Sequence, residues 1–211
     1  MITGRGPNRL QPARYPTTMT GRIRIISGQW RGRRLSVADL PGLRPTPDRA
    51  RETLFNWIGP AIHGKRCLDL FAGTGALGLE AASRGASEVI LVEKSAQAVR
   101  HLESQLLDWP GRECLSIVNA EALSWLAALA DVRPFDLVFI DPPYHQGLQH
   151  LALRALVEQG CLASGTRIYL EAATDEDWRG EDADWIERHF ECLKERRVGA
   201  VMIGLFAPRA L

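Results

Sequence analysis

Four consecutive residues, Asp141-Pro142-Pro143-Tyr144, combine a carboxylate, two prolines and an aromatic ring directly after an apolar run. The prolines restrict the backbone to extended conformations and remove N–H donors, which leaves carbonyl groups available as acceptors. The Asp141 carboxylate and the Pro142 carbonyl could accept the two hydrogens of an aromatic amine while Tyr144 stacks on its ring. Such a loop would direct the nitrogen lone pair at a methyl donor, chiefly by positioning. An ordinary proline turn after a strand is the structural alternative.

A glycine-rich segment is the second chemical motif. Gly73, Gly75 and Gly78 fit the pattern G-x-G-x-x-G of nucleotide-binding turns, although such turns also serve plain packing. Glu93 follows twenty residues after Gly73, where a carboxylate can accept the hydroxyl protons of a ribose. Asp69 would repel the pyrophosphate of a dinucleotide but attract the cationic amino group and sulfonium of S-adenosylmethionine. The charge of Asp69 therefore favours S-adenosylmethionine as the cofactor, unless Asp69 only caps a turn.

These motifs need elements that bring them together, and the sequence predicts a doubly wound, mostly parallel α/β sheet. Short, almost continuously apolar runs are typical of strands that helices cover on both faces. The predicted strands are 66–71, 88–92, 114–118, 135–140 and 167–170. The predicted helices between and after them are 76–84, 96–107, 122–130, 148–159 and 176–185. Two further runs, 189–195 and 198–206, are spaced as a hairpin and place an antiparallel strand at the C-terminal end of the sheet.

The 211 residues divide into three predicted parts. Residues 1–20 have the composition of a disordered basic tail, and residues 61–211 form the domain that carries both motifs. Residues 21–60 form a small extension, with hairpin strands at 22–27 and 33–37 around a turn. A helix from Thr46 to Ile58 completes it, with Thr46 as the N-cap and a proline at the first helical position.

The charge of the chain is unevenly distributed. Residues 1–66 contain 13 Lys and Arg against 3 Asp and Glu, whereas residues 67–211 contain 13 against 22. The net charges of +10 and −9 give the overall +1. Nearly all the basic residues are arginine, which suits bidentate contacts to phosphate. The asymmetry indicates an N-terminal region that binds a polyanion, although a solvated basic tail would have the same composition.

The remaining composition excludes several classes of protein. A chain with 45% hydrophobic and 24% charged residues is neither disordered nor a disulfide-stapled miniprotein. No apolar run reaches the ~18 residues of a membrane span. The four cysteines form no C-x-x-C pair, so we expect free thiols in a cytoplasmic protein, no metal site and a buried Cys67 without nucleophilic function.

The motifs resemble those of a known family. Asp69 to Gly75, Glu93 and Asp141 to Tyr144 are similar to the amino-group methyltransferases that use S-adenosylmethionine. The segment 44–56, RPTPDRARETLFN, and the segment 24–33, RIISGQWRGR, resemble more specifically the RsmD family of 16S rRNA guanine-N2 methyltransferases. The resemblance extends from about Gly21 to Pro208. It implies methyl transfer to the N2 amine of one guanine in an assembled or nearly assembled small ribosomal subunit. Independently of the resemblance, the sequence has no exposed apolar stripe that demands a partner, so we expect a monomer.

The resemblance also implies roles for individual residues. It places Asp69 and the glycine loop at the methionine end of the cofactor, Glu93 at its ribose, and the segment after the third strand near adenine. Glu121 stands where Asp or Asn is common in the family. The predicted cofactor-binding residues are Asp69, Phe71, Ala72, Gly73, Thr74, Gly75, Glu93, Lys94, Ala120, Glu121 and Ala122. The predicted catalytic residues are Asp141, Pro142, Pro143 and Tyr144.

The predicted contacts to RNA lie in the basic N-terminal region. An aromatic residue among clustered guanidinium groups is a plausible RNA-binding surface, although Trp30 could instead pin the hairpin to the body. The polar cluster at the start of the helix could close over the target base or form a surface ion-pair ladder. The predicted residues are Trp30, Arg31, Arg33, Arg34, Arg44, Thr46, Arg49 and Arg51.

Other functions remain open at this point. The Asp-Pro-Pro-Tyr loop alone would also suit N6 of adenine in DNA or the amide of a protein glutamine. The glycine pattern alone would suit a nicotinamide-dependent oxidoreductase, against which Asp69 and the lack of a separate substrate domain count. A non-enzymatic RNA-binding or assembly factor would need neither motif for its role.

Overall fold

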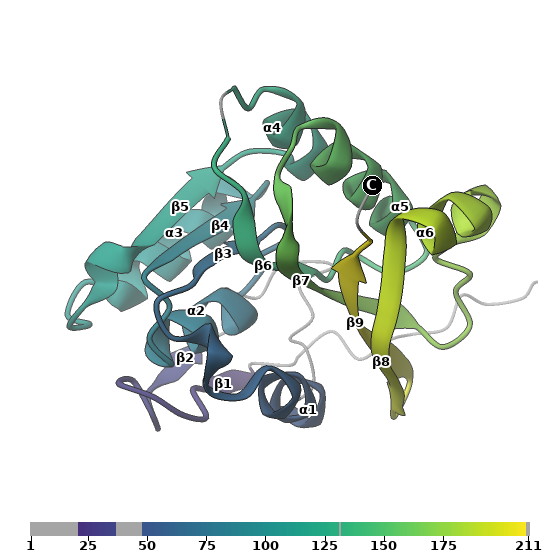
Figure 1. Cartoon of the computed structure of the whole chain (residues 1–211). Coiled ribbons are helices and arrows are strands. Elements are labelled where there is room, and N and C mark those ends of the chain that lie inside the picture. Colours follow the sequence, from purple (N-terminus) through teal and green to yellow (C-terminus); the bar gives the residue numbers. More distant parts are fainter. Residues whose placement is uncertain (1–20, 37–47, 131, 210–211) are drawn as a thin grey trace, which may run out of the picture.

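The computed structural model describes residues 21–36, 48–130 and 132–209 (Figure 1). They form a two-stranded hairpin and a seven-stranded sheet with helices. The hairpin pairs β1 (Arg22–Arg24) with β2 (Arg34–Ser36) in antiparallel register, around the turn that the sequence predicted. The strands of the sheet are β3 (Arg66–Asp69), β4 (Glu88–Glu93), β5 (Leu115–Asn119), β6 (Phe135–Ile140), β7 (Leu162–Ala173), β8 (Phe190–Val198) and β9 (Val201–Pro208).

The strand order in the large sheet is β5-β4-β3-β6-β7-β9-β8. The first five strands in this order are parallel, and β9 lies antiparallel between β7 and β8. From β3 the chain adds β4 and then β5 on one side of the sheet. It then returns and adds β6 on the other side of β3. Ligands of open α/β sheets bind at such a reversal, beyond the carboxyl ends of the two strands. The predicted fold class, with its antiparallel C-terminal strand, is confirmed.

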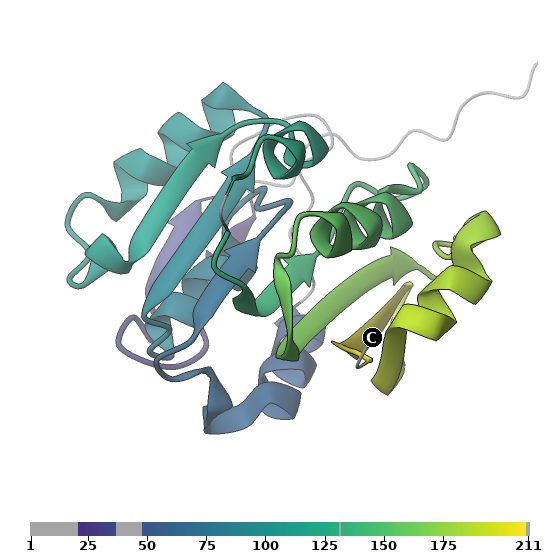
Figure 2. The same cartoon turned by 45° about the horizontal axis from the view of Figure 1, so that its top comes forward.

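Helices cover both faces of the sheet (Figure 2). Side chains along each strand alternate between two hydrophobic cores, as strand geometry requires: Cys67 lies in one core and Leu68 in the other. The hairpin and α1, α2 and α3 contribute to the first core, and α4, α5 and α6 to the second. The helices are α1 (Asp48–Ile58), α2 (Ala76–Ser83), α3 (Ala96–Leu106), α4 (Ala122–Ala127), α5 (Leu148–Glu158) and α6 (Ala183–His189). Short 3-10 helices span Gly59–Ile62, Arg112–Cys114 and Gly180–Asp182.

Two predicted elements differ from the structure. The predicted helix 176–185 is wrong, because Gly180 has a left-handed φ of +51° that interrupts it, and α6 begins only at Ala183. α6 therefore includes His189, which the sequence placed in a strand; its ring stacks on Trp185. The strand predicted at 167–170 is the middle of β7, which extends across 162–173. The Ser and Gly near its start and the glutamate near its end hid this length.

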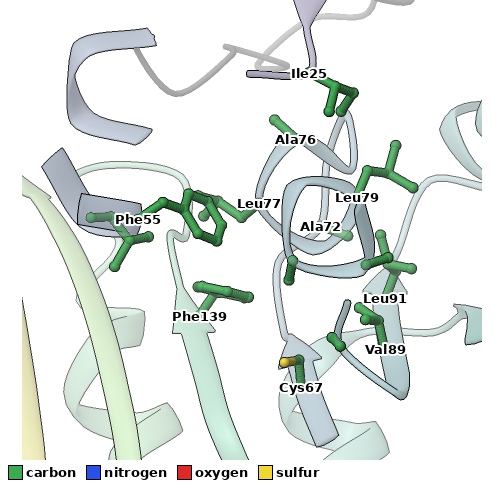
Figure 3. Packing of buried hydrophobic residues seen from close by; sticks show 14 of the residues in the cluster. Ile25, Phe55, Cys67, Ala72, Ala76, Leu77, Leu79, Val89, Leu91 and Phe139 are labelled. Carbon is green, nitrogen blue, oxygen red and sulfur yellow. The ribbon is translucent and has the colours of Figure 1, made fainter. Parts of the chain in front are cut away.

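The N-terminal hairpin is fixed to the first helix after β3. The buried Glu80 carboxylate of α2 accepts hydrogen bonds from the backbone N–H groups of Ile26 (2.7 Å) and Ser27 (3.0 Å). The Ser83 hydroxyl oxygen accepts from the N–H of Trp30 at 2.9 Å. Figure 3 shows Ile25 on the outer side of α2, beside Ala76. The hairpin is thus held to the helix that begins at the glycine loop.

Candidate active site

The glycine loop connects β3 to α2 by a tight turn. Gly73 and Gly75 have φ values of +53° and +76°, in the left-handed region that residues with a Cβ rarely adopt. The N–H of Gly75 donates to the carbonyl of Ala72 at 2.7 Å, and α2 begins at Ala76. The backbone amides at the start of α2 therefore lie at the carboxyl edge of the sheet.

Asp69, the last residue of β3, is buried behind this loop. Its Oδ2 accepts a hydrogen bond from the N–H of Gly78 at 2.9 Å, across the first turn of α2. Burial raises the pKa of Asp69 to about 7; the Gly78 hydrogen bond lowers it and the nearby Glu93 carboxylate raises it. Asp69 therefore does cap the turn, as the alternative interpretation proposed. A cation placed next to it would stabilise its charged form.

Glu93 ends β4 and joins two loops. Its Oε2 accepts from the N–H of Gly73 at 2.9 Å, and its Oε1 accepts from the N–H of Ser95 at 2.7 Å. The side chain is half-buried, and each oxygen can accept further hydrogen bonds. The residue predicted to bind a ribose thus lies directly beside the glycine loop.

The segment after β5 continues the same edge of the sheet. The N–H of Ala120 donates to the Glu93 carbonyl at 3.1 Å, which brings the predicted adenine segment next to β4. Glu121 caps α4: its carboxylate accepts from the backbone of Leu123 and Ser124 at 3.2 and 2.8 Å. These hydrogen bonds, that of Ser124 first, lower the pKa of Glu121. Its carboxylate is exposed and engaged with its own helix.

The Asp-Pro-Pro-Tyr loop lies beside the glycine loop. It follows β6, which pairs with β3 so that Asp69 lies opposite Phe139, two residues before Asp141. The N–H of Leu70 donates to the Phe139 carbonyl at 3.1 Å, and Pro142 is buried. Residue 145, a histidine, has a φ of +60° and so turns the chain sharply after the motif. The two chemical motifs thus meet at the reversal of strand order.

A buried glutamate supports the tyrosine of this loop. The hydroxyl of Tyr144 donates to Oε1 of Glu171 at 2.6 Å, and the hydroxyl of Tyr169 donates to Oε2 at 2.7 Å. Glu171 is fully buried on β7. Burial, aided by the Glu171 carboxylate, keeps the pKa of Tyr169 well above its usual value. Glu171 is not among the site residues predicted from the sequence, where its signal is a carboxylate inside an apolar strand.

A cavity of about 720 Å³ opens beside Tyr144. One wall is α1 and the other is the turn between β8 and β9. α1 is held there by Phe55, whose ring centroid lies 6.0 Å from that of Phe139 (Figure 3). This volume is within the range of small-molecule sites. The lining residues are Asp48, Arg49, Glu52, Thr53, Asn56, Tyr144 and Arg196 to Val201.

The predicted RNA contacts fall into three groups. Arg31, Arg34 and Arg49 are exposed, and Arg33 is half-buried with its guanidinium 5.0 Å from the centroid of Trp109. Arg44 and Thr46 lie outside the residues that the structure describes. The other two, Trp30 and Arg51, lie inside the protein rather than on its surface, which corrects the prediction.

The two corrected residues have structural roles. Trp30 is 1% exposed, its indole N–H donates to the Pro110 carbonyl at 2.7 Å, and it packs on Trp109, so that it pins the hairpin to the body. Arg51 is completely buried, and its Nη2 donates to the Arg24 carbonyl (3.1 Å) and to Asp48. It therefore joins α1 to the hairpin.

Three further observations concern the Cys67 thiol, metal binding and membrane-spanning helices. Cys67 is buried, as predicted, and burial raises its pKa to about 12, which suppresses the thiolate. Within the described ranges, no three His, Cys, Asp or Glu side chains are grouped so that they could hold a metal ion. None of the described helices is long and apolar enough to cross a membrane.

The fold and the arrangement of the two motifs define a class I methyltransferase with a Rossmann-like sheet. The same fold occurs in the C-terminal domain of precorrin-6Y C5,15-methyltransferase from Rhodobacter capsulatus, with a TM-score of 0.58 and 20% identity over 79% of this chain and 91% of that one.

The particular family follows from closer relatives. The chain belongs to the family described as Conserved hypothetical protein 95, whose model matches residues 23–207; this is the RsmD family that the motifs resemble. It is 45% identical to ribosomal RNA small subunit methyltransferase D of Escherichia coli over 191 residues, 90% of this chain and 92% of the relative. The solved structure of yhhF from Escherichia coli has a TM-score of 0.77 and 38% identity, covering 90% of this chain and all of that one.

Proposed function

We propose that this protein transfers a methyl group from S-adenosylmethionine to the N2 amine of a guanine in small-subunit rRNA. The observation that carries the proposal is the placement of the Asp141–Tyr144 loop beside the glycine loop, with Tyr144 on the wall of a cavity of nucleotide size. The name of the relative in Escherichia coli supports small-subunit rRNA as the substrate.

The residues at the carboxyl edge suit the proposed cofactor. Asp69 is a buried carboxyl that a cationic amino group or sulfonium would stabilise in its charged form. The positive end of the helix dipole at the start of α2 suits a carboxylate, and Glu93 suits the ribose hydroxyls. When bound, S-adenosylmethionine supplies an electrophilic methyl group on a sulfonium.

The Asp-Pro-Pro-Tyr loop would position and deprotonate the acceptor. The Asp141 carboxylate and the Pro142 carbonyl accept the two hydrogens of the guanine N2 amine, so that its lone pair points at the methyl group. The Tyr144 ring stacks on the base. As the N–C bond forms and the S–C bond breaks, the nitrogen becomes cationic, and one of its protons leaves to Asp141 or to water. Rate acceleration comes chiefly from this positioning.

Methyl transfer to purified substrates tests the proposal. The protein is incubated with labelled S-adenosylmethionine and small subunits from cells that lack the corresponding gene, or with protein-free 16S rRNA from the same subunits. We expect one methyl group on the N2 of one guanine, located by mass mapping of nuclease fragments. Asp141→Ala should lower kcat at least about 100-fold with cofactor affinity retained, whereas Asp108→Ala, at an exposed acid outside the site, should not.

The same experiment distinguishes the assembled subunit from free rRNA as the substrate. Label on the assembled subunit but not on free rRNA would define the assembled particle as the substrate. If cofactor binds normally and neither RNA is labelled, the rRNA assignment is wrong and the acceptor is another amine.

A further inference from the structure

Three arginines line the cavity from its two opposite walls. Arg49 belongs to the first turn of α1, and Arg196 and Arg197 stand at the end of β8, next to the β8–β9 turn. All three are exposed. Residues of α1 and of this turn line the same cavity, and Figure 1 shows the lower end of the β8–β9 hairpin on the same side of the molecule as α1. The RNA contacts predicted from the sequence lie in the N-terminal region alone and do not include Arg196 or Arg197.

The charges of these arginines are not neutralised locally. Among the described residues, none of the three forms an ion pair, although Asp48 and Glu52 line the same cavity. Residues 67–211 carry a net charge of −9, so that two adjacent unpaired arginines stand out on an acidic body. A pair of guanidinium groups on the rim of a concave site attracts an anion.

The turn is a firm support for these side chains. Nε of Arg197 donates to the Gly199 carbonyl at 3.1 Å, and Gly199 adopts a left-handed φ of +63° that closes the turn. Val201 is buried in the core. The Lys194 Nζ lies 6.0 Å from the ring centroid of Trp57, which links β8 to α1. The terminal guanidinium nitrogens of Arg197 thus remain available to a ligand on a fixed backbone.

We propose that the β8–β9 turn, through Arg196 and Arg197, binds the phosphates of the RNA strand next to the target nucleotide. This inference rests on the proposed function, since it places that RNA in the cavity beside Tyr144. With the base against Tyr144, the sugar and phosphates lie toward the rim, where Arg196 and Arg197 face Arg49. Guanidinium groups match phosphate oxygens in bidentate geometry, and such contacts position the strand without reading its sequence. The RNA would then be held by two surfaces, the N-terminal hairpin and the β8–β9 turn.

The double variant Arg196→Gln/Arg197→Gln tests this surface. We expect the KM for small subunits to rise about tenfold or more, and the slope of log affinity against log salt to become shallower by about 1 to 2, as two lost phosphate contacts imply. The kcat at saturating subunits and the affinity for S-adenosylmethionine should stay within about twofold of wild type. The variant Arg196→Lys/Arg197→Lys should keep most of the salt dependence, since it keeps the charges.

Arg167→Gln/Arg188→Gln is the matched control, because both arginines are exposed but lie outside the cavity. It removes the same charge and should leave the KM and the salt slope unchanged. Equal effects of both double variants, or no effect of the Arg196/Arg197 pair on KM and salt slope, would overturn the proposal. A wild-type protein that binds cofactor but neither binds nor methylates small subunits would instead refute the proposed function itself.

Discussion

Tyr144 contacts two environments, with its ring on the cavity wall and its hydroxyl in the protein interior. The hydroxyl donates to the buried Glu171, which Tyr169 also contacts. An aromatic residue on a loop can adopt several rotamers, and a hydrogen bond to a fixed strand selects one of them. The hydrogen bond from Tyr144 to Glu171 therefore positions the Tyr144 ring, which is proposed to stack on the base.

Removing each hydroxyl in turn separates positioning from stability. Tyr144→Phe and Tyr169→Phe should each cost about 1–3 kcal/mol of unfolding free energy, because each leaves a buried carboxylate with one donor fewer. Only Tyr144→Phe should also lower kcat/KM for methyl transfer, by about tenfold (about 1.4 kcal/mol), since Tyr169 does not line the cavity. Urea unfolding and steady-state kinetics measure the two effects. An unchanged kcat/KM in Tyr144→Phe would contradict the positioning role of its hydrogen bond to Glu171.

Asp69 gives the free energy of unfolding a specific pH dependence. Its pKa is about 7 in the folded protein against 3.8 for an ordinary aspartate, so the folded state binds more protons than the unfolded state between these values. Its contribution to stability is therefore present below about pH 4 and is lost as pH rises toward 7. Asp69→Asn cannot titrate and should become more stable relative to wild type from pH 5 to pH 7, by about 1 kcal/mol per pH unit, and level off above pH 7. Urea unfolding of both proteins at pH 5, 6, 7 and 8 measures this, and a difference that does not change with pH would contradict it.

At the scale of elements, the N-terminal hairpin depends on a close approach between two backbones. Gly28 has a φ of +84°, and a Cβ there would lie 1.8 Å from the carbonyl oxygen of Ser83 on α2. The neighbouring N–H of Gln29 donates to that oxygen at 2.7 Å. A side chain at position 28 would therefore break the contact that places the hairpin on α2.

A second glycine in the same turn supplies the control. Gly32 has nearly the same φ, +83°, but a Cβ there meets nothing within 4 Å. Gly32→Ala should cost only the backbone strain, about 1–2 kcal/mol, whereas Gly28→Ala should cost clearly more and increase hydrogen exchange at the Trp30 amide. Urea unfolding and exchange measured by NMR would test this. Equal destabilisation by the two substitutions would show that the hairpin shifts freely on α2.

Elements whose local signals agree could be predicted from the sequence. The hairpin, the strand from 135 to 140 and the helix after the glycine loop have consistent apolar periods and turn residues, and the structure has them in place. The region 174–189 has a glycine within a helical pattern, and there the tertiary structure decides where the helix begins. Propensity alone cannot position that boundary.

At the scale of the whole molecule, the two motifs could be predicted but not what surrounds them. Asp69 ends β3 and Asp141 directly follows β6, and the pairing of these two strands brings their loops together. Glu171 acquires its role only because Tyr144, twenty-seven residues earlier, meets it in space. Arg196 and Arg197 look like ordinary residues of an edge strand until α1 packs opposite them. Burial of Trp30 and Arg51 likewise depends on contacts between distant segments, which local patterns do not encode.

The position of β9 in the sheet also has a consequence for the synthesis and folding of the chain. β9 follows β8 in the sequence, but in the sheet β9 lies between β7 and β8, and β8 is the edge strand. β8 therefore cannot join the sheet until β9 has been synthesised. The two strands are adjacent in sequence and can form as a hairpin, which then docks on β7 as a unit. A chain interrupted between Val198 and Pro208 would leave the long edge of β7 unpaired, and such edges template aggregation. Incomplete translation products of this protein are therefore expected to be insoluble rather than partly active.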